Sequence, residues 1–231
     1  MWKKRVLVAG ASGDIGYAVT KALHEAGAQV FMLGRQRDNL ARRTLPETGA
    51  KPVLLAADLT SPSDIERVQA ELQQHQPLHA IVMSSGVYTR SADVGIFRMQ
   101  MENNVIGPYA LLRRVVPCLV EGEGDVVFIN SSQALRASAN VGQYAATKHA
   151  MRAIADSLRE EVNELGVRVT SIYLGRTAGE TQREIAAIEE RPYRPEYLIQ
   201  PADVGNLVRY VLQSPRTAEI TDISMRPTRK G

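Results

Sequence analysis

Short apolar runs alternate along the chain with longer segments in which apolar residues recur at a helical period. Most of the short runs are continuous rather than alternating, which is typical of strands covered on both faces of a parallel sheet. Strands are therefore expected in seven segments: residues 4–10, 28–34, 52–58, 78–85, 124–132, 166–174 and 219–225.

The amphipathic segments between these runs predict helices near residues 14–26, 36–45, 61–75, 95–120, 143–164 and 201–213. The third has Ser61 as its expected N-cap and Pro62 at its first helical position. Strands that alternate with helices favour an α/β protein with a parallel sheet. We expect a three-layer, doubly wound Rossmann fold, with a seven-stranded, mainly parallel sheet and helices on both faces.

The chain shows no internal repeat, low-complexity tract or linker, so residues 1–231 are expected to form a single dinucleotide-binding domain. Its least regular part, residues 175–200, contains prolines and charges of both signs. This composition predicts a loop or short helices, and we expect a substrate lid at about 176–199.

Composition narrows the class of protein further. The net charge is +3 and no long run of like charge occurs, so we expect no nucleic-acid partner. The single cysteine, Cys118, cannot form an internal disulfide, and no cluster of histidines and carboxylates has the spacing of metal ligands. No apolar stretch approaches the roughly 20 residues of a membrane span, and the early apolar run is too short for a signal peptide. We expect a cytoplasmic protein without a membrane or metal partner.

A glycine-rich segment, "AGASGDIG", follows the first predicted strand and opens the first helix. Gly10 would allow a tight turn, Gly13 the approach of a pyrophosphate, and Gly16 close packing of helix on strand. The free N–H groups of the first helical residues, Asp14 and Ile15, would face the phosphates. The alternative is a glycine-rich turn without a ligand.

The end of the second strand indicates which dinucleotide binds. An acidic residue there would suit the ribose of NAD, whereas an arginine accommodates the 2′-phosphate of NADP. Arg35 occupies this position and Ser12 could add a hydroxyl, so NADP(H) is expected and NAD(H) is disfavoured. Arg35 as a solvated surface residue is the alternative.

After the third strand, Asp58 could bind the adenine amino group and Leu59 could cover the ring. The alternative for Asp58 is that it stabilises a turn.

The segment "GQYAATKHA" places Tyr144 and Lys148 one helical turn apart, 13 residues after Ser131 at a strand end. Ligands of doubly wound sheets bind at this edge. Here the sequence resembles the short-chain dehydrogenase/reductase family, which has a Ser…Tyr-x-x-x-Lys signature in this order. The resemblance covers essentially the whole chain. Taken alone, the pair reads as a partly buried aromatic and a solvated lysine, and Ser132 is an alternative to Ser131.

These side chains suit carbonyl chemistry. A lysine cation would lower the tyrosine pKa from its usual value of about 10, so that Tyr144 acts as acid in reduction and base in oxidation. Ser131 would polarise the substrate oxygen. The resemblance further implies that Lys148 binds the nicotinamide ribose. It also implies that Asn104, in "NNVIG", anchors a water behind the lysine. The alternative for Asn104 is a polar residue that kinks a long helix.

The chain departs from the family pattern in three segments. Asp14 stands where the family commonly has glycine, and a carboxylate near a pyrophosphate is unfavourable unless it points away or caps a helix. The segment "SSG" replaces the family's "NAG" and retains Ser85 and Gly86 as expected cofactor contacts. The segment "LGRT" replaces a "PG" motif but keeps Gly175 and Thr177, which could contact the nicotinamide.

The resemblance implies an NADPH-dependent carbonyl reductase that acts reversibly on a small ketone, aldehyde or alcohol. The alternatives are an NAD-dependent alcohol dehydrogenase that works oxidatively and a non-catalytic NADP(H)-binding sensor. Specificity is expected in residues 87–98, 133–143 and 176–199. Family members commonly pair through the helices that flank the site, so a homodimer or homotetramer is implied.

Overall fold

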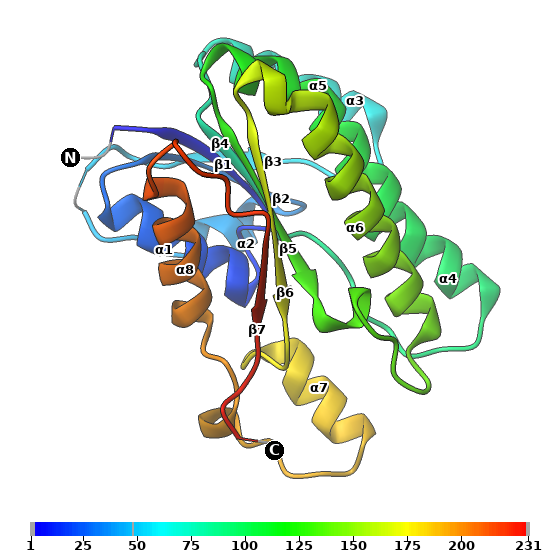
Figure 1. Ribbon diagram of the computed structural model, residues 1–231. Coiled ribbons are helices and arrows are strands. Elements are labelled where there is room, and N and C mark those ends of the chain that lie inside the picture. The colour runs from blue at the N-terminus through cyan, green and yellow to red at the C-terminus, as the bar shows by residue number, and fades with distance from the viewer. Residues whose placement is uncertain (1–2, 48, 230–231) are drawn as a thin grey trace.

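The computed structural model describes residues 3–47 and 49–229, and its centre is a seven-stranded sheet (Figure 1). All its strand pairings are parallel, in the order β3-β2-β1-β4-β5-β6-β7. The strands are β1 (Arg5–Ala9), β2 (Gln29–Gly34), β3 (Val53–Ala56), β4 (Ala80–Met83), β5 (Asp125–Ser131), β6 (Arg168–Leu174) and β7 (Asp222–Met225). The predicted doubly wound α/β fold is confirmed.

Helices cover both faces of this sheet (Figure 1). One face carries α1 (Asp14–Glu25), α2 (Arg37–Ala41) and α8 (Pro201–Gln213), and the other carries α3 (Pro62–Gln73), α4 (Val94–Met101), α5 (Gly107–Glu121) and α6 (Gly142–Val162). Ser61 caps α3 as expected, because its hydroxyl accepts a hydrogen bond from the Asp64 N–H at 3.3 Å.

The continuous apolar runs follow from this layering. Successive side chains of a strand point to opposite faces, so a strand between two helical layers buries all of them. In β1, Val6 and Val8 pack toward α1 and α8, whereas Leu7 and Ala9 pack toward the layer of α5 and α6. The sheet therefore separates two cores and holds its strand ends rigidly.

Two helix predictions need correction. The segment 95–120 is not one regular helix, because a π-helical stretch, Glu102–Ile106, separates α4 from α5. The segment 36–45 forms only the five-residue α2, after which the chain turns toward the glycine-rich loop. π-Helical stretches often occur at functional sites, and this one contains Asn104.

The irregular segment 175–200 contains a nine-residue helix, α7 (Glu180–Ile188), beyond the carboxyl ends of the strands (Figure 1). The strand order reverses between β1 and β4, and doubly wound sheets bind their ligands in the crevice at this point. Within the described residues, no helix is long and apolar enough to cross a membrane.

Candidate active site

The glycine-rich loop packs tightly between β1 and α1. Gly10 has φ +86°, and a Cβ atom on it would lie 2.7 Å from the backbone nitrogen of Ser85. A Cβ atom on Gly16 would overlap the carbonyl oxygen of Gly10. Gly13 is less constrained, because a Cβ atom there would keep 3.5 Å from that oxygen. Gly13 and the first residues of α1 line the main cavity, and the first N–H groups of a helix lack partners within it.

Asp14, the first residue of α1, turns its carboxylate to two partners. One oxygen pairs with the Arg43 guanidinium at 2.9 Å, and the other accepts the backbone N–H of Glu180 at 2.9 Å. The second contact joins the loop to the start of α7. The sequence offered no sign of either partner.

Arg35 directly follows β2 and is exposed. No hydrogen bond or ion pair engages its side chain in the part of the chain that the structure describes. The Ser12 hydroxyl lies beside Gly34, 3.2 Å from where a Cβ atom on that residue would be. An arginine at the end of β2 and a hydroxyl beside the preceding residue are suitable donors for a phosphate.

Asp58 stabilises a turn, which is one of the two roles that the sequence suggests for it. Its Oδ1 atom accepts hydrogen bonds from the backbone N–H of Thr60 at 2.9 Å and from the Thr60 hydroxyl at 2.8 Å. Leu59 packs against the core on the α5 side of the sheet. Neither residue lines the main cavity, so their expected adenine contacts stay predictions.

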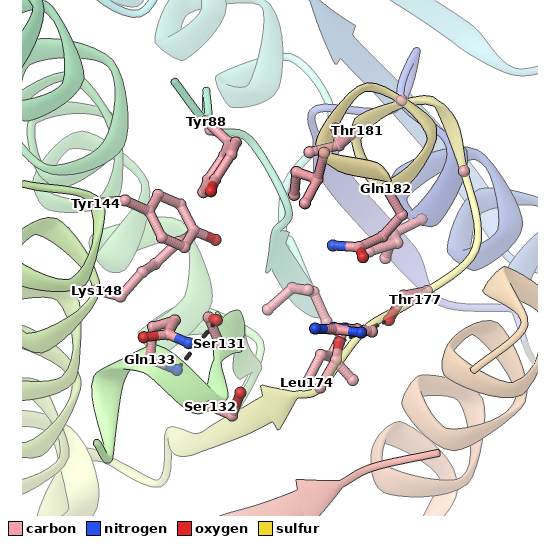
Figure 2. A pocket seen from close by; sticks show the side chains of 18 of the residues that line it. Tyr88, Ser131, Ser132, Gln133, Tyr144, Lys148, Leu174, Thr177, Thr181 and Gln182 are labelled. Atoms are coloured by element: carbon pink, nitrogen blue, oxygen red, sulfur yellow. Dashed lines mark hydrogen bonds between the residues drawn. The ribbon is translucent and has the colours of Figure 1, made fainter. Parts of the chain in front are cut away.

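Ser131, Tyr144 and Lys148 meet at one wall of a cavity of about 430 Å³ that the glycine-rich loop also lines. Ser131 ends β5, Tyr144 lies in the first turn of α6, and Lys148 is one turn further. Figure 2 shows these side chains facing Thr177 and Gln182 across the cavity. Of the two candidate serines, Ser131 is the one whose hydroxyl acts on the pKa of Tyr144, and this hydroxyl also accepts the Gln133 N–H at 3.2 Å.

Burial changes the acidity of both titrating groups. It raises the pKa of Tyr144 to about 12, and the hydrogen bond with Ser131 opposes this rise. Burial lowers the pKa of Lys148 to about 8. The Lys148 ammonium lies 5.5 Å from the centre of the tyrosine ring. The expected lowering of the Tyr144 pKa is therefore wrong, because burial disfavours the phenolate more than Ser131 stabilises it.

Asn104 lies behind Lys148, and its side-chain amide makes three hydrogen bonds. Its oxygen accepts the Val87 N–H at 2.7 Å, and its nitrogen donates to the Val87 carbonyl at 2.9 Å and to the Thr147 hydroxyl at 3.2 Å. Asn104 thus fixes the chain after β4 while it sits in the π-helical stretch.

A second, small cavity of about 10 Å³ lies next to Asn104 and is also lined by Ser85, Asn130 and Lys148. It is close to the minimum size for one water, and its walls carry several polar groups. Asn130 also braces the site, because it donates to the Lys148 carbonyl at 3.2 Å.

The residues around the crevice fit a dinucleotide. The Ser85 hydroxyl is buried and has no hydrogen-bond partner among the described residues, and a Cβ atom on Gly86 would crowd Asn104 at 3.2 Å. On the opposite wall, Gly175 and Thr177 line the cavity, and the Thr177 hydroxyl donates to the Gly175 carbonyl at 3.2 Å. Close backbone approach, free N–H groups and unpartnered donors are the features that phosphate and amide groups require.

Sequence reasoning did not single out several residues that shape the cavity. Tyr88 packs edge-on to Tyr144, with ring centres 5.0 Å apart, and Gln182 points into the cavity from α7 (Figure 2). Arg90 pairs with Glu189 at 2.8 Å at the far end of α7. All of these lie in the segments expected to carry specificity, but only the folded chain shows which side chains turn inward.

No group of three or more histidine, cysteine, aspartate or glutamate side chains is placed to hold a metal in residues 3–47 and 49–229. The cavity is lined by a glycine-rich loop at the start of a helix, a partly buried tyrosine and a buried lysine, at the carboxyl edge of a parallel sheet. Together these features define a dinucleotide-dependent oxidoreductase class.

Comparison with known proteins agrees with this class. The family model for short chain dehydrogenases matches residues 4–190. The chain is 33% identical over 187 residues to dehydrogenase/reductase SDR family member 7B of Danio rerio, covering 74% of the chain and 60% of that relative's length. It is 27% identical over 232 residues to an uncharacterized oxidoreductase of Staphylococcus aureus, with 97% of each covered. The chain belongs to the short chain dehydrogenase family, as the sequence resemblance predicted.

Among solved structures, the closed form of a serine dehydrogenase complexed with NADP+ superposes with a TM-score of 0.88 at 24% identity. The match covers 98% of this chain and 96% of that one. At this level of identity the likeness establishes the shared fold.

Proposed function

We propose that the chain is an NADPH-dependent carbonyl reductase that converts a ketone or aldehyde to an alcohol. The observation that carries the proposal is the grouping of the Tyr144 and Ser131 hydroxyls and the Lys148 ammonium in the cavity that the glycine-rich loop lines. A proton donor, a second oxygen-binding hydroxyl and a cation are the groups that reduction of a carbonyl needs.

The proposed cofactor is NADPH. Arg35 and Ser12 would hold the 2′-phosphate, and the loop from Gly10 to Gly16 would hold the pyrophosphate. NADP+ in the related serine dehydrogenase structure and NADPH in a polyketide ketoreductase with a TM-score of 0.86 support this choice. When bound, the reduced nicotinamide supplies a hydride.

In the proposed reaction, Ser131 donates a hydrogen bond to the substrate carbonyl oxygen and keeps it within reach of Tyr144. Tyr144 then donates its proton to that oxygen as negative charge develops. Lys148 stabilises the phenolate that remains. Asn104 and the small cavity behind Lys148 would hold the water that returns a proton.

The raised pKa of Tyr144 favours reduction over oxidation, because it keeps the hydroxyl protonated. With a pKa raised to about 12, its hydroxyl stays protonated at neutral pH and can serve as the acid. Alcohol oxidation would need the phenolate as the base, and little phenolate is present at that pH. Oxidation is therefore proposed as the slower, alkaline direction.

A panel of ketones and aldehydes, assayed by loss of the NADPH absorbance, tests this function. Tyr144→Phe keeps the ring but removes the proton, so the turnover number should fall by roughly 10²- to 10⁴-fold. Tyr210→Phe, on the exposed outer side of α8, is the control and should retain wild-type turnover. Undiminished turnover in Tyr144→Phe would exclude the tyrosine as the acid.

A further inference from the structure

Helix α7 lies in the segment expected to form a substrate lid and is called the lid helix below; it begins without a cap of its own. Its N-cap residue, Gly179, has no side chain, and the first N–H groups of a helix lack partners within it. The Gly179 N–H donates to the Tyr193 hydroxyl at 3.0 Å, and the Glu180 N–H donates to the Asp14 carboxylate at 2.9 Å. Asp14 therefore caps α7 from another helix, 166 positions away in the sequence.

The contact between Asp14 and α7 is closely fitted. A Cβ atom on Gly179 would come within 2.5 Å of the Asp14 Oδ2 atom, and the backbone there has φ +149°. Any side chain at position 179 would displace the carboxylate. Asp14, Gly179 and Glu180 all line the main cavity, so the contact lies at the edge of the proposed cofactor site.

Arg43 balances the charge of this carboxylate. Its guanidinium pairs with Asp14 at 2.9 Å, donates to the Ser12 carbonyl at 2.9 Å and lies 5.1 Å from the centre of the Tyr17 ring. These three contacts hold it beside the loop. Without this partner, the Asp14 carboxylate would repel a pyrophosphate at the start of α1.

We propose that Asp14 is a positioning residue that ties the lid helix α7 to the phosphate-binding loop. Arg43 is the charge partner that makes this tie compatible with a bound dinucleotide. The proposal rests on the dinucleotide site of the proposed function. It accounts for an aspartate where the family commonly has glycine, because the carboxylate serves the lid and its charge is neutralised.

Calorimetric titration with NADPH and NADH tests the role of Arg43. Arg43→Ala should weaken both cofactors by the same factor, on the order of tenfold, because the uncompensated carboxylate acts on the pyrophosphate that they share. Asp14→Asn combined with Arg43→Ala should restore the affinity, since the charge is then gone. Arg42→Ala removes an exposed arginine one position away and should leave both affinities unchanged.

Limited trypsin digestion of the cofactor-free protein tests the tie between Asp14 and the start of α7. Arg183 lies in the first turn of α7, and its side chain is 64% exposed. Asp14→Ala should accelerate cleavage after Arg183 several-fold, whereas Asp14→Asn should do so less because its amide oxygen can still accept the Glu180 N–H. Urea unfolding of each variant shows whether the whole fold has changed instead.

The proposal is overturned if Arg43→Ala weakens NADPH alone, since Arg43 would then contact the 2′-phosphate directly. It is equally overturned if the double variant fails to recover affinity, or if Asp14→Ala leaves cleavage after Arg183 at the wild-type rate. Neither measurement uses turnover, so absence of carbonyl reduction would leave the tie intact. If the wild-type protein binds neither cofactor, the proposed function fails and the digestion alone decides the tie.

Discussion

Lys148 gives the site a pH dependence that a solvated lysine would not give. Its ammonium is buried, and burial lowers its pKa to about 8, so the cation is present below that pH and lost above it. Tyr144, with a pKa of about 12, stays protonated throughout this range. If the charge of Lys148 supports proton donation, reduction must weaken as the lysine loses its proton.

We therefore expect kcat/KM for carbonyl reduction at saturating NADPH to fall as pH rises through about 8. The fall should approach tenfold for each pH unit above that value, because only the protonated lysine is active. The measurement is a pH profile of the initial rate. A rate that stays level up to pH values where free lysines titrate would show that Lys148 is not the titrating group.

The spacing of Ser131, Tyr144 and Lys148 predicted that these residues meet, because a strand end and the next helix of a parallel sheet share one edge. The partner of Asp14 could not be predicted in this way. Arg43 follows a short helix whose end the sequence does not mark. The Glu180 N–H is a backbone group, so no residue type in the sequence indicates it as a partner. Contacts of this kind depend on packing between distant segments.

At the scale of elements, two glycines of the glycine-rich turn are expected to have different roles: Gly16 in stability and Gly13 in cofactor binding. Gly16 lies where the backbone of α1 touches Gly10, so Gly16→Ala forces a displacement that should lower the free energy of unfolding by about 1–3 kcal/mol. Gly13 has φ −75°, an ordinary value, and has room for a methyl group. Gly13→Ala should leave stability nearly unchanged but weaken NADPH binding, because the added methyl group would obstruct the pyrophosphate.

Urea unfolding and NADPH titration of both variants measure these two effects. Equal stability of Gly16→Ala and wild type would contradict the close packing of α1 on β1. Unchanged NADPH affinity in Gly13→Ala would move the pyrophosphate away from the turn.

The strands were predictable because continuous apolar runs mark burial on both faces. The π-helical stretch was not, because it accompanies hydrogen bonds between Asn104 and the Val87 backbone that join two separate segments. The extent of α7 was equally unpredictable, since the residue that caps its start belongs to α1.

At the scale of the whole molecule, we propose that the chain forms the homodimer or homotetramer that the family resemblance implies. Ile106, which ends the π-helical stretch, and Tyr109, in the first turn of α5, are 49% and 44% exposed, and large apolar side chains on a helix surface suit a partner copy. Light scattering during size-exclusion chromatography should give a mass of two or four chains. Ile106→Glu with Tyr109→Glu should reduce it, whereas Ile188→Glu on α7 should not. A monomeric wild-type protein would contradict this proposal.

The proposed reaction depends on a dinucleotide bound at the glycine-rich loop, so calorimetric titration with NADPH and NADH tests it most directly. The wild-type protein should bind NADPH more tightly than NADH. Arg35→Ala should weaken NADPH by roughly 10- to 100-fold, the loss of a charged hydrogen-bonded contact, and should leave NADH unchanged. Tighter binding of NADH, or no effect of Arg35→Ala on NADPH, would contradict the assignment of the cofactor, and failure to bind either dinucleotide would contradict the proposed reaction as a whole.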